Sequence, residues 1–148
     1  MFGQSDLNSN KALVRRYYDE AFNGCRPEVV EELAVEDYVE HDPFPGMGNG
    51  RADLTNRVRG ILAAFSPLFF TIEDVVAEGD RVVVRWSQVG THSGDFMGIP
   101  ATGRQFTIAG IDVHRLRDGR MSEHWHVVDQ LALLGQLGVI PQPAGAPA

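Results

Sequence analysis

Apolar residues in the first part of the chain recur at intervals of three and four, the spacing of helices that bury one face. A first helix is predicted over residues 9–24, because Ser9 suits an N-terminal cap and Gly24 suits a left-handed C-terminal residue. A second, shorter helix is predicted over residues 27–38, beginning with a proline. A third is predicted over residues 54–65, and the Ser-Pro pair that follows forbids its continuation.

After these helices the pattern changes to strands rich in aromatic and β-branched residues. Segments 69–76 and 81–89 are predicted to form one hairpin, and segments 104–116 and 120–130 a second hairpin that turns at Asp118-Gly119. Leucines after residue 130 predict a closing helical turn or two. Helices followed by antiparallel strands indicate an α+β fold, in which three N-terminal helices cover one face of a curved antiparallel or mixed sheet.

Composition narrows the class of protein. With 148 residues, 43% of them hydrophobic, we expect one domain over residues 1–140 and a flexible tail of prolines and small residues over 141–148. The formal net charge of −7 argues against nucleic acid or anionic lipid as a partner. A single cysteine and the absence of any run near roughly 18 apolar residues favour a cytoplasmic protein with no membrane segment.

The second hairpin is predicted to gather chemistry on one face. If its two-residue turn sets the pairing, Arg117 faces Arg120 and the pairing continues without interruption. Side chains alternate between faces, so one face then carries three pairs: Asp112 with Trp125, His114 with Glu123, and Ile108 with Asp129. Such a polar group under helices predicts a pocket. The opposite face would carry Ala109, Ile111, Val113, His124, His126 and Val128.

Two of these residues are the candidate catalysts. Asp129, set among apolar neighbours, would lose hydration, its pKa would rise, and it would serve as both base and acid. His114 would donate a hydrogen bond to a carbonyl that gains negative charge. The alternatives are a solvent-exposed or turn-capping Asp129, and a simple cross-strand pair of His114 with Glu123.

Other residues carry weaker signals. Trp86 is either core or pocket wall, and His41 is either an exposed loop residue or part of the pocket rim. The run His124-Trp125-His126 puts two imidazoles on one face without a third ligand, so we expect no metal and no other cofactor. The apolar outer stripe of Ala109, Ile111, Val113 and Val128 predicts a homodimer or homotetramer.

An ordered set of motifs resembles the SnoaL-like polyketide cyclases, also called ester cyclases. The matching segments are GDRVVVRW at 79–86, GTHSG at 90–94, GIPATGR at 98–104, DGRMSEHW at 118–125, and Asp129 followed by LGQLG at 134–138. The resemblance implies the cone-shaped α+β barrel of the nuclear transport factor two superfamily. It departs from many relatives at Ser66-Pro67-Leu68, where these often carry an acidic residue.

The resemblance also implies a function. It implies a cofactor-independent intramolecular aldol closure of the last ring of an aromatic polyketide, commonly a methyl ester. Asp129 would be the acid/base residue and His114 its partner, while the substrate-binding residues would be Asp112, Trp125, Trp86, His41 and Glu123. The alternatives are an epoxide hydrolase or cofactor-free hydroxylase on the same fold, or a domain that only binds a small molecule.

Overall fold

A computed structural model describes residues 2–141. Helix α1 (Gln4–Arg16) continues as a π-helical segment (Tyr17–Asn23), and a short 3-10 turn (Pro27–Val29) leads into α2 (Val30–Leu33). The remaining elements are β1 (Ala34–Glu40), α3 (Arg51–Ala64), β2 (Phe65–Glu78), β3 (Arg81–His92), β4 (Gln105–Arg117), β5 (Arg120–Val128) and α4 (Gln130–Gln136). The tail predicted over 141–148 lies outside the described residues, apart from its first position.

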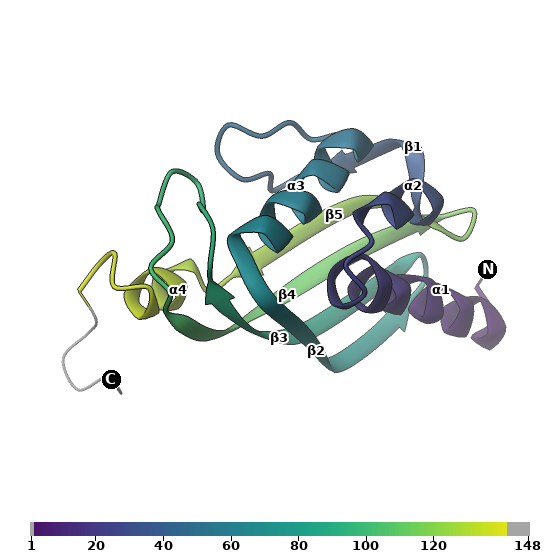
Figure 1. The fold of residues 1–148 in the computed structure, drawn as a ribbon. Coiled ribbons are helices and arrows are strands. Elements are labelled where there is room, and N and C mark those ends of the chain that lie inside the picture. Colours follow the sequence, from purple (N-terminus) through teal and green to yellow (C-terminus); the bar gives the residue numbers. More distant parts are fainter. Residues whose placement is uncertain (1, 142–148) are drawn as a thin grey trace.

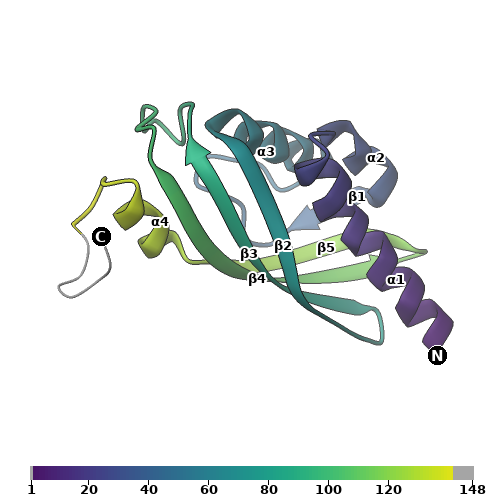
Figure 2. The same cartoon turned by 60° about the horizontal axis from the view of Figure 1, so that its bottom comes forward.

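The five strands form one curved sheet in the order β1-β5-β4-β3-β2. Strand β1 runs parallel to β5, and all the other neighbours are antiparallel. Helices α1, α2 and α3 lie over the same face of the sheet, and α4 closes one end (Figures 1 and 2). The predicted α+β class with a mixed, helix-covered sheet is therefore confirmed. In the described part of the chain, no helix is long and apolar enough to cross a membrane.

The helix boundaries differ from the prediction, and the third helix spans Arg51–Ala64 in place of 54–65. The first helix begins before Ser9, because the Asp6 carboxylate accepts a hydrogen bond from the backbone N–H of Gly3 at 2.9 Å and so caps the N-terminus. The second helix ends at Leu33, and the predicted helical stretch up to Tyr38 is instead the strand β1. Backbone pairing with β5 outweighs the local helical spacing there.

Both hairpins form where the sequence predicts them. The turn at Asp118-Gly119 has φ values of 53° and 75°, the left-handed geometry that two-residue hairpins require. The second hairpin nevertheless contains a β-bulge. Leu116 pairs with Met121, but Arg115 pairs with Glu123, so Ser122 is an extra residue on β5.

The bulge reverses the predicted facing of β5. Side chains alternate with a period of two, so one extra residue moves every later side chain to the opposite face. The observed partners are Asp112 with His126 and His114 with His124, in place of Asp112 with Trp125 and His114 with Glu123. The prediction was right for the inward face of β4 and wrong for that of β5.

Candidate functional site

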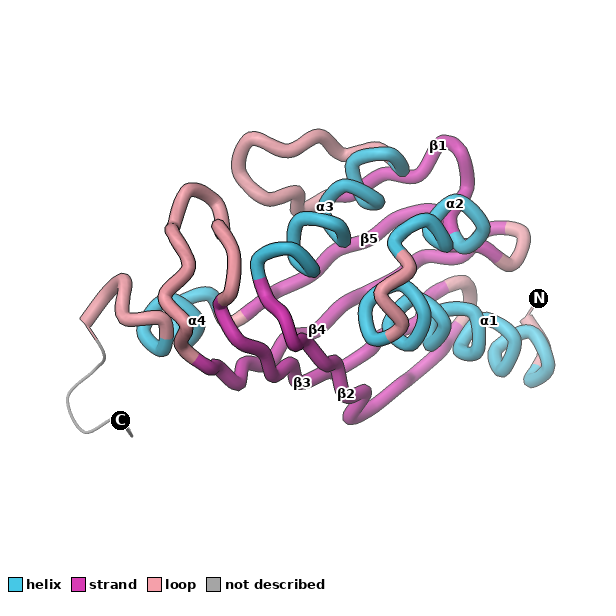
Figure 3. Tube along the Cα trace, viewed as in Figure 1, coloured by secondary structure: helices cyan, strands magenta, loops and turns pink. Residues whose placement is uncertain are grey.

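An aromatic hollow lies between the sheet and the helices. Two loops, 41–50 and 93–104, lie on the side of the molecule toward α4 (Figure 3), and they contribute Phe44 and Phe96 to its wall. A second hollow near α4 shares Phe44, Phe96 and His126 with the first. The polar side chains that line the first hollow are Tyr17, Tyr18, Arg57, Gln88, Asp112, His126 and Gln130.

Asp112 is a buried carboxylate that accepts two hydrogen bonds on one oxygen and faces a histidine with the other. Its Oδ2 accepts hydrogen bonds from the Tyr18 hydroxyl and, at 2.9 Å, from the Trp86 indole Nε1. Its Oδ1 lies 3.2 Å from the Nε2 of His124. Burial alone would raise the pKa of Asp112, but the charge and hydrogen bond of His124 hold it well below the usual range. Asp112 is therefore ionised and has little tendency to take up a proton.

Gly110 explains why Trp86 can reach Asp112. The two residues are paired between β3 and β4. A Cβ at position 110 would lie 2.2 Å from the Trp86 ring, closer than real Cβ atoms come. The missing side chain gives the indole room to lie across the strand, so a glycine on β4 positions one of the donors to the carboxylate.

His124 lies between two carboxylates. Its Nδ1 is 2.7 Å from Glu40 Oε1 on β1, and its Nε2 faces Asp112. Burial lowers the pKa of His124, but the charge of Asp112 and the hydrogen bonds to both carboxylates outweigh this effect and raise it. Arg57 of α3 forms an ion pair with Glu40 and donates to the Tyr17 hydroxyl at 3.2 Å.

These four groups form a buried network of two carboxylates, a guanidinium and an imidazole. Each side chain is at most 8% exposed. Burial raises the pKa of Glu40, but the hydrogen bond and charge of His124 together with the charge of Arg57 bring it down to about 2. The ion pairs compensate for the loss of hydration on both sides, so the charged forms persist inside the protein. Glu40, Arg57, Asp112 and His124 together make up this buried network.

His114 lies beside this network and uses its N–H in a hydrogen bond to Tyr18. The Tyr18 hydroxyl donates to Asp112, so the contact of 2.8 Å between Tyr18 and His114 Nε2 has the imidazole as donor. Burial and the charge of His124 lower the pKa of His114 to about 3, which keeps the ring neutral. His114 does not line the hollow, and its Nδ1 is buried without a hydrogen-bond partner in the described chain.

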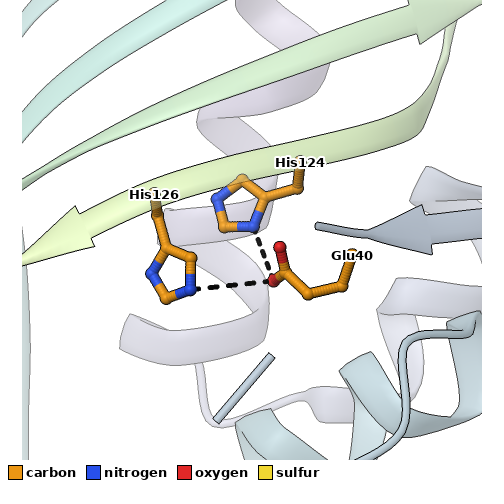
Figure 4. A group of neighbouring side chains, drawn as sticks. All are labelled: Glu40, His124 and His126. Carbon is orange, nitrogen blue, oxygen red and sulfur yellow. Dashed lines mark hydrogen bonds and ion pairs between the residues drawn. The ribbon is translucent and has the colours of Figure 1, made fainter. Parts of the chain in front are cut away.

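His126 presents a different arrangement. Its Nε2 lies 2.7 Å from the backbone carbonyl of Asp42, and its backbone N–H donates to the Asp42 carboxylate at 3.0 Å. A carbonyl only accepts, so Nε2 carries the proton and Nδ1 carries the lone pair. Burial, with the charges of Arg57 and His124, lowers the pKa of His126. Figure 4 shows Nε2 directed toward Glu40 and the other ring nitrogen turned away from it.

Three predicted site residues lie on the outer face of the sheet. The Trp125 ring stacks on His41 with centroids 4.5 Å apart, and His41 Nε2 lies 2.9 Å from Glu123. Arg115 also binds Glu123, at 2.8 Å. The bulge at Ser122 is the cause, because it turns Glu123 and Trp125 outward. The expectation that these three line the pocket with Asp112 is wrong.

The position predicted for Asp129 also needs correction. Asp129 follows β5, is exposed, and caps α4 by accepting a hydrogen bond from the backbone N–H of Ala132 at 3.0 Å. It is neither opposite Ile108 nor part of the wall of the hollow. The alternative of a turn-capping aspartate describes its geometry. Val128, which we expected on the outer stripe, lines the hollow instead.

Several residues of the site were missed from the sequence. Neither Glu40 nor Arg57 was singled out from the sequence, so neither was expected beside two histidines. Tyr17 and Tyr18 are consecutive and both at most 2% exposed, which an ordinary helix face does not predict. They begin the π-helical segment, whose wider turn changes the direction of side chains. The spacing of His124 and His126 was noticed but placed on the wrong face.

Glu40, His124 and His126 offer donor atoms within 4.8 Å of one another, as a metal site would. Those atoms already form ion pairs or hydrogen bonds within the protein. Glu40 Oε1 binds both Arg57 and His124, and His126 Nε2 donates to the Asp42 carbonyl. A divalent cation would have to displace these partners and lie beside a buried guanidinium. The donor set fits an internal ion-pair network better than a metal centre.

Known proteins resemble this chain over most of its length. Residues 12–137 match the family model described as SnoaL-like polyketide cyclase. The chain is 32% identical over 141 residues to aklanonic acid methyl ester cyclase DauD of Streptomyces sp. (strain C5), covering 90% of this chain and 84% of that protein. It is also 32% identical to aklanonic acid methyl ester cyclase DnrD of Streptomyces peucetius, covering 90% of this chain and 94% of that one.

A solved structure shares the fold. TsrD from Streptomyces laurentii superposes with a TM-score of 0.83 and 28% sequence identity, covering 95% of this chain and all of that one. The arrangement of strands and covering helices is therefore shared along almost the whole chain.

Proposed function

Because the chain belongs to the SnoaL-like polyketide cyclase family, we propose that it is an enzyme that closes a carbon ring in an aromatic polyketide ester by intramolecular aldol addition. Two relatives that are 32% identical to the chain are named aklanonic acid methyl ester cyclases. The observation that carries the proposal is the aromatic hollow with ionisable side chains in its wall. Such a hollow suits a flat, apolar substrate with several carbonyl groups.

The reaction needs a base, an acid and a donor for the enolate oxygen. A base removes a proton from a carbon between two carbonyls, and the enolate carbon attacks a ketone carbon of the same molecule. The carbon–carbon bond forms, and the alkoxide receives a proton, so the product is an isomer of the substrate. Side chains can carry out both proton transfers, and the reaction involves no oxidation or reduction.

Tyr17 is suited to donate to the enolate oxygen. Its hydroxyl accepts a hydrogen bond from Arg57 and donates to no acceptor in the described chain. Burial raises the pKa of Tyr17 to about 12, although the charge of Arg57 opposes this effect, so the hydroxyl stays protonated. A neutral donor polarised by a guanidinium stabilises negative charge that develops on a nearby oxygen.

The test is turnover of a defined substrate. Purified protein incubated with aklanonic acid methyl ester should yield an isomer of equal mass with one more ring, detected by chromatography with mass spectrometry and by NMR. A product that gains oxygen from labelled water or dioxygen would point to hydrolase or hydroxylase chemistry. Tight binding without any product from this or related open-ring esters would favour a domain that only binds its ligand.

The residues first assigned to catalysis stay a prediction for this test. Asp129→Asn should abolish ring closure if Asp129 transfers the proton, and His114→Gln should weaken it if His114 steadies the enolate. Asp129 is exposed and the proton of His114 is committed to Tyr18, so the geometry gives these roles little support.

We place the enzyme in cytoplasmic antibiotic biosynthesis, working as a homodimer or homotetramer. The outer sheet face, with exposed Ile111 and Val127, supports the assembly. Light scattering tests the assembly, and a monomer at micromolar concentration would contradict it.

A further inference from the structure

The ring-closing reaction requires a proton acceptor, and the wall of the hollow offers few. Asp112 accepts hydrogen bonds from Tyr18 and Trp86 and lies beside His124. His124 holds its proton between two carboxylates. Tyr17 and Tyr18 remain protonated because burial raises the pKa of both. Arg57 is a permanent cation. His126 is the remaining titratable side chain of the wall.

His126 is placed where a substrate can meet it. It lines both the aromatic hollow and the second hollow that opens toward α4. Its side chain is 8% exposed, so the ring is largely shielded from solvent. Nδ1 makes no hydrogen bond to any residue from 2 to 141. An accessible lone pair in an apolar wall is the arrangement that a general base needs.

Asp42 fixes which nitrogen is free. Its backbone carbonyl accepts from Nε2, and its carboxylate accepts from the backbone N–H of His126. These two contacts fix both the backbone and the imidazole ring of His126 against Asp42. The ring also stacks on His124 with centroids 4.9 Å apart. The tautomer and the orientation of the ring are thus set by the protein before a substrate arrives.

The charges around His126 suit a group that gains and returns a proton. Arg57 and His124 are cationic and keep the resting ring neutral. Glu40 Oε1 lies 4.0 Å from Nε2 and stabilises the imidazolium once it forms. A carboxylate behind an imidazole acts in the same sense in catalytic triads. The facing charged groups are therefore Arg57, His124, Glu40 and Asp42.

We propose that His126 is the general base of the ring closure, acting through Nδ1, with Asp42 as the positioning residue that fixes its tautomer. This inference rests on the proposed function. The proton leaves the carbon between two carbonyls for Nδ1, and the electrons of the C–H bond form the enolate. After the carbon–carbon bond forms, the alkoxide takes the proton back from Nδ1, and the imidazole is neutral again.

The first experiment measures proton removal and ring closure separately. In deuterated water, the wild-type protein should exchange the acidic carbon-bound proton of aklanonic acid methyl ester for deuterium, followed by NMR, and also form the isomer. His126→Gln keeps a donor for the Asp42 carbonyl and removes the basic nitrogen. It should lower kcat for both processes by about 10²–10⁴-fold with little change in KM.

A second variant keeps the proposal testable if glutamine perturbs the fold. His126→Ala leaves a space that added imidazole can enter. Rates should recover with imidazole, and substituted imidazoles of higher pKa should restore them further, which a purely structural role would not produce. Nitrogen NMR of the wild-type protein should show His126 with an unprotonated Nδ1 at neutral pH.

The outcomes are distinct. Wild-type exchange that His126→Gln loses, with no ring closure in either protein, would support His126 as a base and reject the cyclase proposal. Ring closure that persists in His126→Gln, or that is lost in Asp129→Asn alone, would overturn the role of His126 and leave the cyclase proposal intact. Wild-type protein that neither exchanges nor closes the ring would overturn both.

Discussion

Glu40 is the residue whose removal should reveal the buried network most clearly. Glu40→Gln keeps the shape of the side chain and removes its charge. Its Oε1 then no longer balances Arg57 and His124, which are buried together with only Asp112 as counter-charge. Breaking one partner of a buried ion pair typically destabilises a protein by about 3–5 kcal/mol.

The magnitude can be expressed as a melting temperature. For a chain of this size, about 1 kcal/mol shifts Tm by roughly 2–4 °C, so the variant should melt roughly 6–20 °C below the wild type. Calorimetry or circular dichroism measures the shift. Glu36→Gln is the matched control, because Glu36 is an exposed residue of the same strand. Its effect should stay within about 0.5 kcal/mol.

A double-variant cycle tests the cause. Arg57→Met combined with Glu40→Gln should be less destabilised than the sum of the single variants, because neither charge is then left without its partner. A Glu40→Gln protein that melts within about 2 °C of the wild type would refute the idea that the network is a set of charged groups. Additive losses in the double variant would show that Glu40 and Arg57 do not interact.

Three further predictions follow from single contacts. The pKa of Glu40 is lowered from 4.5 to about 2, so its ionised form stabilises the fold above pH 4.5; the difference in unfolding free energy between wild type and Glu40→Gln should shrink as the pH falls toward 2, measured by urea titration. Gly110→Ala should displace the Trp86 ring and destabilise the protein by about 1–3 kcal/mol, with a change in tryptophan fluorescence; an unchanged spectrum and stability would contradict the close packing. Asp129→Ala should cost about 0.5–2 kcal/mol through the lost helix cap, whereas Asp129→Asn, which can still accept from Ala132, should unfold at nearly the wild-type temperature.

Much of the fold could be predicted because its signals are local. The helix over 51–64, both hairpins and the turn at Asp118-Gly119 depend on periodicity and on residues that tolerate left-handed geometry. The strand Ala34–Glu40 could not be predicted in this way. Its pairing partner lies more than 80 residues further along the chain, and no periodic pattern within the segment reports that partner.

The candidate site was harder to predict because one residue decides its composition. The pairing of β4 and β5 is regular from the turn to Leu116, and the bulge then changes which β5 residues face inward. Asp112 was placed correctly, but His126 was exchanged for Trp125. Periodicity alone therefore leaves two equivalent assignments of strand β5.

The buried network has a consequence for how ligands enter and leave. Glu40, Asp112, Arg57 and His124 together carry a total charge of zero. In the proposed reaction the neutral imidazole of His126 takes a proton from a neutral ester, so an anion and a cation arise side by side and vanish together. The interior stays electrically neutral at every stage, and neither substrate nor product is retained by a long-range field. In this scheme, aromatic contacts rather than a net charge hold the substrate and the closed ring.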